Sequence, residues 1–182
     1  MAKQFPRIGL GHQNFIEAQQ IFFVATAAPE GRVNLSPKGM DSLRVLGPNR
    51  IAWLNVTGSG NETAGHLKQS PRMTLMWCSF DATPMILRAY GTARTVQRDS
   101  ADWAELADLF PGGPEKRQVY DLSVEMVQTS CGYAVPTADG MTERPVLKDW
   151  AADKGEDGIR AYWSERNRTT IDGAPTGIED NL

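Results

Sequence analysis

The segment 57–63, Thr-Gly-Ser-Gly-Asn-Glu-Thr, has the composition of a loop that binds an oxyanion. It stands between an apolar run at 51–54, which indicates a strand, and residues 64–69, which indicate a helix. A short turn at the N-terminus of a helix presents unpaired backbone N–H groups, and the helix dipole adds a positive potential there. This order of elements therefore predicts a phosphate site.

The individual residues of the segment support the same interpretation. Gly58 and Gly60 have no side chain, so the backbone can come close to a ligand. Ser59, Asn61 and Thr63 carry groups that hydrogen-bond to phosphate oxygens.

A second interpretation needs no ligand. Ser59 and Glu62 have the Ser-x-x-Glu spacing of a capping box, in which the two side chains satisfy the amides at a helix N-terminus. A nearby Glu62 would also oppose a bound anion. The sequence alone leaves both interpretations open.

Several other chemistries have no matching motif. The segment lacks the Gly-x-Ser-x-Gly spacing of a hydrolase elbow, and the chain has neither a Walker loop nor a dinucleotide fingerprint. His66 lies on the expected helix after the loop, where a packed or surface histidine is the ordinary interpretation. No nucleophile, base and orienting acid stand together in the pattern.

Composition limits the class of protein. The chain has 182 residues, 41% of them hydrophobic and 23% charged, which predicts one soluble domain with a real core. A formal charge of −3 gives no signature of binding to nucleic acid or an anionic membrane. No apolar run is long enough to span a membrane, and the N-terminus does not resemble a secretory signal.

The cysteines and histidines favour a cytoplasmic protein without a metal. Cys78 and Cys131 lie far apart in strand-like segments, where a free cysteine acts as a small hydrophobic residue. A reducing compartment suits them. The only histidines, His12 and His66, are widely separated, so we expect no metal site.

Alternating and apolar runs predict six strands joined mostly by hairpins, with a bulge or bend at Gly91. Short helices are expected near 14–20, 64–69 and 100–110. The polar C-terminal part, about 137–182, contains two further helical patterns near 146–151 and 157–167. The pattern favours a mainly β fold, a small barrel with peripheral helices, as one domain with a C-terminal helical extension. The expected strands cover 21–26, 33–36, 50–55, 73–80, 86–96 and 124–133.

Five segments resemble the pyridoxamine 5′-phosphate oxidase-like proteins, the FMN-binding split-barrel family. They are Asn-Leu-Ser-Pro-Lys-Gly-Met-Asp at 34–41, the loop with its helix at 57–67, Ile-Leu-Arg-Ala-Tyr-Gly at 86–91, Ser-Cys-Gly-Tyr-Ala-Val-Pro at 130–136 and Thr-Ile-Asp-Gly-Ala-Pro at 170–175. The last two are similar to one poorly characterised subgroup. The resemblance implies a six-stranded antiparallel split barrel and a homodimer with FMN at the subunit interface.

The resemblance also implies positions for the cofactor. The turn around Lys38 would run beside the flavin, the end of the expected strand at 50–55 would offer backbone along the isoalloxazine edge, and the loop would receive the phosphate. The residues so assigned are Ser36, Pro37, Lys38, Leu54, Asn55, Val56, Ser59, Gly60, Asn61 and Thr63.

One departure from the family bears on the phosphate. The true oxidases carry an Arg-Lys pair where this chain has Gly60 and Asn61, so a cation must come from elsewhere. Lys38 and Arg72 are the nearest candidates in sequence. Because charge-assisted hydrogen bonds are roughly twice as strong as neutral ones, the loop alone predicts weaker FMN binding than in those oxidases. Vitamin B6 oxidation does not carry over with the fold.

Three functional hypotheses follow from these observations. The first is an FMN-dependent oxidoreductase that acts on a small molecule, because a flavin supplies redox chemistry that the protein need not provide. The second is a non-catalytic carrier or sensor of flavin or haem, although only His12 and His66 could bind haem iron as imidazoles. A barrel that binds no cofactor is the third.

Overall fold

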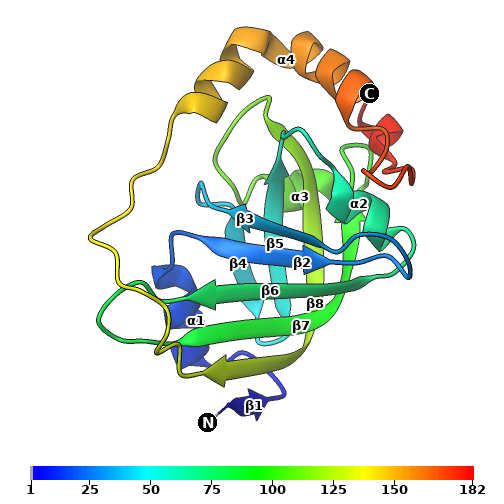
Figure 1. Ribbon diagram of the computed structural model, residues 1–182. Helices are drawn as coiled ribbons and strands as arrows, with labels where there is room; N and C mark the ends of the chain where they lie inside the picture. The colour runs from blue at the N-terminus through cyan, green and yellow to red at the C-terminus, as the bar shows by residue number, and fades with distance from the viewer. Residues whose placement is uncertain (1) are drawn as a thin grey trace.

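The computed structural model describes residues 2–182, and its main feature is an antiparallel sheet of eight strands that curls into a barrel (Figure 1). The strand order is β3-β2-β6-β7-β8-β5-β4, and β1 pairs with β8 beside this path. The mainly antiparallel β fold that the sequence predicts is confirmed. The strands are β1 Lys3–Phe5, β2 Phe22–Thr26, β3 Asn34–Lys38, β4 Leu43–Gly47, β5 Arg50–Val56, β6 Arg72–Cys78, β7 Ile86–Val96 and β8 Lys116–Ser130.

The barrel is split between β3 and β4. These strands follow each other in the chain with only residues 39–42 between them, yet they lie at opposite ends of the strand order. Within the connection, Met40 and Asp41 have φ of 63° and 53°. A left-handed conformation costs an L-residue about 1–2 kcal/mol, and such strain is often kept where a ligand binds. The seam is therefore a natural place for a site.

The expectation of six strands is too low. All six are present, but β1 and β4 were missed, and β8 begins at Lys116 instead of residue 124. β1 has only three residues, and β4 is an edge strand with no clear alternation of buried and exposed side chains. The first half of β8 is buried on both faces and includes the polar residues Arg117 and Gln118, which disrupt the apolar pattern of a core strand.

Alternation along the strands builds two apolar cores. Trp53 and Tyr120 point into the barrel, where their rings lie 4.5 Å apart. Leu54, on the opposite face of β5, packs outside with Leu106. The bulge expected at Gly91 is confirmed, because the register of β7 and β8 shifts between Tyr90 and Gly91, where β8 contributes the extra residue Glu125. A Cβ at Gly91 would stand 1.9 Å from the backbone oxygen of Ser123.

Outside the sheet, residues 2–182 form four α-helices and one short 3₁₀ helix (Figure 1). The last α-helix is interrupted at Gly155 with φ of 64°, so its halves correspond to the two C-terminal helices that the sequence predicts. No helix in this range is long and apolar enough to cross a bilayer. The helices are α1 Leu10–Ala18, α2 Glu62–Leu67, α3 Trp103–Ala107, α4 Val146–Arg166 and η1 Ile178–Asn181.

The two cysteines differ in environment. Cys78 is buried at the end of β6, in accord with the expectation. Cys131 is exposed, so the expectation that it lies inside a strand is wrong. β8 ends at Ser130 because the chain turns at Gly132, whose φ is 68°.

Candidate functional site

One cavity of about 370 Å³ lies at the seam of the barrel, and it gathers every residue that the sequence assigned to the cofactor. Its volume is in the range of about 300–1,000 Å³ that is typical of small-molecule sites. The end of β3, the end of β5 and the loop before α2 form its walls. The ten assigned residues that line it are Ser36, Pro37, Lys38, Leu54, Asn55, Val56, Ser59, Gly60, Asn61 and Thr63.

The loop before α2 is held from its buried side by two side chains. Arg117 of β8 donates to the carbonyl oxygen of Gly58 at 3.3 Å and to that of Gly60 at 3.0 Å. Asn167, after α4, donates through Nδ2 to Gly58 at 3.0 Å and to Ser59 at 3.4 Å. Three successive carbonyl groups therefore face inward.

This arrangement fixes the direction of the loop amides. In a trans peptide the C=O and the following N–H point in opposite directions, so the N–H groups of residues 59–61 point away from Arg117 and Asn167. None of them donates to another protein group within residues 2–182. Unpaired amides in series form a concave donor surface that suits an oxyanion.

Arg117 is a buried cation without a carboxylate partner in the described part of the chain. Its side chain is 2% exposed, and burial lowers the pKa of its guanidinium to about 10. Its Nε–H has no acceptor among residues 2–182. A buried charge without a counter-ion is costly, and an anion in the adjoining cavity would offset that cost.

Lys38 adds a second positive charge to the same cavity. Burial, followed by repulsion from Arg117, lowers the pKa of Lys38 to about 8. Its Nζ lies 5.7 Å from the centre of the Trp53 ring. The sequence interpretation of Lys38 as a candidate cation agrees with this position, since the side chain lines the cavity and is not simply solvated.

The capping-box interpretation of the loop is wrong. The N-cap of α2 is Asn61, without a side-chain cap, and the Glu62 carboxylate instead accepts the N–H of Ile171 at 3.1 Å. Asn61 is 2% exposed, yet within the described part of the chain neither its Oδ1 nor its Nδ2 has a partner. Thr63 accepts from Asn34. The N–H of Ser59, which a capping box would pair with Glu62, therefore has no acceptor among residues 2–182.

Three other sequence candidates lie away from this cavity. Arg72 donates to Ser70 and lines a different hollow beside β6 and β7, so it is not the cation of the loop. His66 is buried and shares a hydrogen bond of 3.1 Å with Thr26, which agrees with a packed histidine. His12 lies on α1, where its Nδ1 accepts the N–H of Gly9. Neither histidine lines the cavity.

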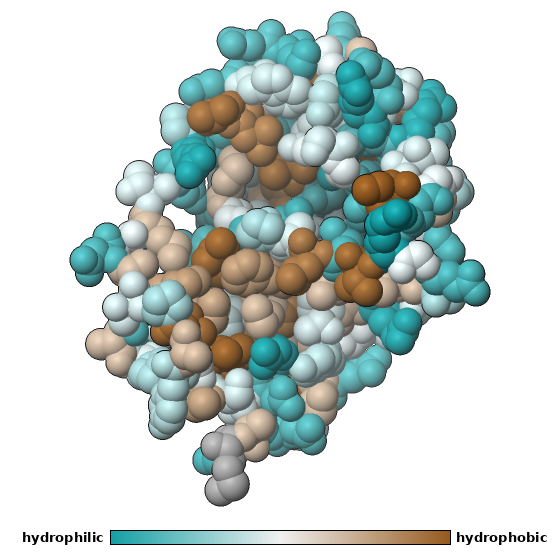
Figure 2. All heavy atoms as spheres, in the orientation of Figure 1, coloured by the Kyte–Doolittle hydropathy of each residue, from teal (hydrophilic) through white to brown (hydrophobic). Residues whose placement is uncertain are grey.

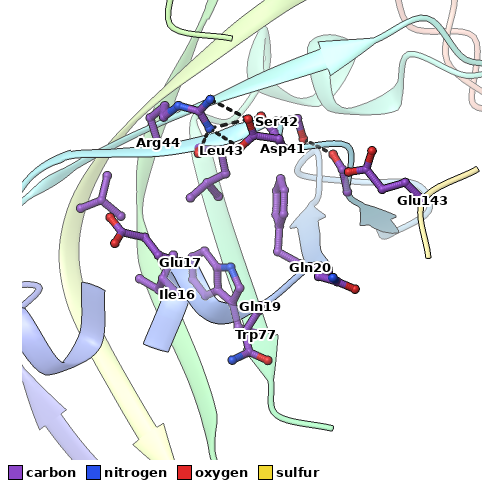
Figure 3. Close-up of a pocket in the computed structure, with 13 residues that line it drawn as sticks. Ile16, Glu17, Gln19, Gln20, Asp41, Ser42, Leu43, Arg44, Trp77 and Glu143 are labelled. Carbon is purple, nitrogen blue, oxygen red and sulfur yellow. Dashed lines mark hydrogen bonds and ion pairs between the residues drawn. The ribbon is translucent and has the colours of Figure 1, made fainter. Parts of the chain in front are cut away.

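Two further hollows adjoin the site at the 39–42 connection. One, of about 520 Å³, has the Asp41–Arg44 ion pair on its rim, and Figure 3 shows Glu143 approaching from the C-terminal connection. The other, of about 580 Å³, is mostly apolar and extends under the start of α4. It shares residues 37–40 with the candidate site. Figure 2 shows apolar side chains gathered around a hollow on this face.

The arrangement can bind an anion at one end and an uncharged, ring-like group at the other. The 59–61 amides, Arg117 and Lys38 provide the positive side, whereas the space beside Met40 is apolar. No group of three His, Cys, Asp or Glu side chains suited to a metal occurs within residues 2–182. The cavity walls, which its lining residues define, include no Ser-His or Cys-His pair.

Comparison with known proteins gives a consistent match. A family model described as pyridoxamine 5′-phosphate oxidase matches residues 11–131. A relative from Aspergillus flavus, the pyridoxamine 5′-phosphate oxidase family protein ustO, is 35% identical over 179 residues, covering 86% of this chain and 70% of the relative.

Solved structures show the same fold at lower identity. A candidate pyridoxamine 5′-phosphate oxidase from Lactobacillus delbrueckii is 23% identical with a TM-score of 0.54, over 68% of this chain and 94% of that one. HupZ from Group A Streptococcus is 18% identical with a TM-score of 0.54, over 73% of this chain and 99% of that one.

Proposed function

Since the chain belongs to the pyridoxamine 5′-phosphate oxidase family, we propose that it is an FMN-dependent oxidoreductase that acts on a small molecule. One observation carries the proposal: unpaired amides, an unpartnered buried Asn61 and two cations, Lys38 and Arg117, surround one cavity at the seam. This is the donor set of a phosphate site. FMN, when bound, supplies hydride or electron transfer.

The phosphate would lie at the 59–61 amides, with Thr63 and Asn61 as side-chain donors. Arg117 provides charge from beneath the loop and takes the place of the Arg-Lys pair that this chain lacks. The isoalloxazine ring would lie toward residues 36–38 and the backbone of 54–56. These assignments extend the sequence prediction, and they add Arg117, which the sequence did not single out.

The substrate would enter from the apolar hollow that shares residues 37–40 with the FMN cavity. Ile21, Met40, Leu147 and Trp150 are among its walls, and its volume of about 580 Å³ suits a small organic molecule. Because the hollow is shared between the barrel and residues 141–150, substrate selection would depend on a part of the chain outside the family match at 11–131.

A homodimer is part of the proposal. Leu35 lies in the edge strand β3 and is 64% exposed, and Val33 lies directly before this strand and is 73% exposed. Apolar side chains on an open sheet edge favour association with another chain. A second copy placed there would lie next to the cavity, in line with a flavin at the subunit interface.

Absorption spectroscopy of the purified protein tests the proposal. Flavin bands that are released by denaturation, followed by reduction with NADH or NADPH and reoxidation by an acceptor, support an oxidoreductase. Bound flavin that is not reduced would favour the carrier function. Colourless protein that does not quench the fluorescence of added FMN contradicts both.

A further inference from the structure

The C-terminal segment, from the last turns of α4 to the end of the chain, is built into the back of the anion loop. Trp163 donates its indole N–H to the hydroxyl of Thr57 at 2.8 Å, and both side chains are buried. Asn167 is fully buried beneath the loop. Asn181 donates to the backbone oxygen of Arg117 at 2.8 Å. All three contacts come from residues beyond 131, where the family match ends.

Asn167 makes two opposite kinds of contact at once. Its Oδ1 accepts from the guanidinium of Arg117 at 2.7 Å, while its Nδ2 donates to the carbonyl groups of Gly58 and Ser59. A carboxylate could accept from Arg117, but it could not donate to the carbonyls, and it would neutralise the cation. An amide of this length satisfies both requirements.

A second set of contacts joins the segment to α2, as Figure 1 shows where the C-terminal end lies beside that helix. The N–H of Ile171 is held by the carboxylate of Glu62. Thr170 lies so close to Gly65 that a Cβ at this glycine would stand 2.2 Å from its methyl group. Glu62 is thereby turned toward residues 170–172.

We propose that Asn167 is a positioning residue of the anion site. It holds Arg117 under the loop and keeps the carbonyl groups of residues 58 and 59 inward, so that the following amides stay available to an anion. The C-terminal segment is then a working part of the site and not only a cover for the barrel. The inference rests on the proposed function for the identity of the anion, which is the phosphate of FMN.

The test compares FMN with riboflavin, which has the same ring without the phosphate. Titrations that follow flavin fluorescence are made with wild type, Asn167→Asp and Asn167→Ala. We expect FMN binding to weaken by roughly 10- to 100-fold in both variants, because charge-assisted contacts to the phosphate are lost. Riboflavin binding should change by less than about twofold.

Two controls separate positioning from stability. Arg168→Ala removes an exposed side chain of the same segment that contacts Ser164 and Glu179, and it should leave both affinities unchanged. Melting curves show whether each variant is folded. If Asn167→Asp does not fold, Asn167→Ala, which introduces no charge, gives the answer. Equal losses for FMN and riboflavin, or unchanged FMN binding in a folded variant, overturn the inference.

Failure of the proposed cofactor would be seen separately. If the wild type binds neither flavin, the proposed function is wrong, and inorganic phosphate becomes the probe. Phosphate that raises the melting temperature of wild type but not of Asn167→Asp supports the inference. Equal stabilisation of both proteins, or of neither, overturns it.

Discussion

The two ends of the seam cavity are built in opposite ways. At the loop end, Thr57, Asn61, Arg117 and Asn167 are each at most 2% exposed, and a network of hydrogen bonds joins three distant parts of the chain. At the other end, the adjoining hollow is mostly apolar and is closed by residues 141–150, many of which are exposed.

The difference indicates a division of roles. A rigid end, whose free donors are held in place by hydrogen bonds on its buried side, is suited to one fixed group, because these donors are oriented before the ligand arrives. An apolar end with few directional contacts can accept molecules of different shape. We therefore expect substitutions at the loop end to change cofactor affinity, and substitutions at the open end to leave it almost unchanged.

The largest effect is expected at Arg117. Arg117→Met keeps much of the side-chain length but removes the charge and leaves the carbonyl groups of Gly58 and Gly60 without their donor. FMN binding should weaken by about 1.5–3 kcal/mol, the usual worth of a hydrogen bond to a charged group. Flavin fluorescence titration of wild type and variant measures this loss of affinity. Arg117→Lys retains the charge and should lose less, and equal binding by both variants and wild type would show that this cation has no role.

The junction between α2 and the C-terminal segment should respond next. Gly65→Ala places a methyl group against Thr170 and should destabilise the fold by about 1–3 kcal/mol, the usual cost of overpacking. Gly11 is the matched control, because it lies in α1 with nothing within 4 Å of its Cβ position. Gly11→Ala should stabilise by about 0.5–1 kcal/mol. Chemical denaturation measures the free energy of unfolding of both variants. If it changes by a similar amount in both, the junction between Gly65 and Thr170 is loosely packed.

The pH dependence of binding tests Lys38. Its pKa of about 8 in the free protein is below the ordinary 10.5, and a bound phosphate dianion would raise it. FMN affinity should therefore fall as pH rises from about 8 toward 10, by at most about tenfold per pH unit. Lys38→Met should remove this decrease. A wild-type affinity that is constant over that range would place the phosphate away from Lys38.

The lowered pKa of Lys38 also predicts how the stability of the protein without ligand depends on pH. Stability should rise with pH, whereas FMN affinity falls. Since the folded protein binds the Lys38 proton less tightly than the unfolded chain does, the unfolded chain carries more protons between about pH 8 and 10.5. The contribution of Lys38 to the free energy of unfolding should then increase with pH over this window. Denaturation of wild type and Lys38→Met at pH 8 and pH 10 measures the difference between the two proteins.

The smallest effect is expected at Trp150, in the wall of the open hollow. Its ring packs on Tyr162 with centroids 5.1 Å apart, and it is not among the residues that line the loop cavity. Trp150→Ala should leave FMN affinity within about twofold of wild type, because this side chain lines the apolar hollow and not the phosphate end of the seam cavity, so no hydrogen bond to the phosphate is lost. A change as large as that of Arg117→Met would remove the distinction between the two ends.

The sequence could predict those parts of the site that depend on neighbouring residues. The loop, the strand before it and the turn at Lys38 are local patterns, and the ten residues chosen from them do line one cavity. That they bind FMN stays a prediction. The six expected strands were likewise predicted from local patterns, namely alternating and apolar runs of residues.

The parts that were missed depend on contacts between distant residues. Arg117 is 59 residues from Gly58, and no local pattern distinguishes it from the polar residues beside it in β8, Lys116 and Gln118. Asn167 follows a helix and resembles an ordinary polar C-terminus. The capping box was wrong because Glu62 found a partner at Ile171, which no spacing rule within the loop could indicate. The polar residues buried between elements were the least predictable from sequence.

The most direct test of the account is a titration of purified wild-type protein with FMN at pH 7, followed by quenching of flavin fluorescence. The account predicts saturable quenching with one FMN for each chain, and clearly weaker binding of riboflavin because it lacks the phosphate that the loop holds. Absence of quenching by the folded protein, or equal affinity for FMN and riboflavin, would contradict it.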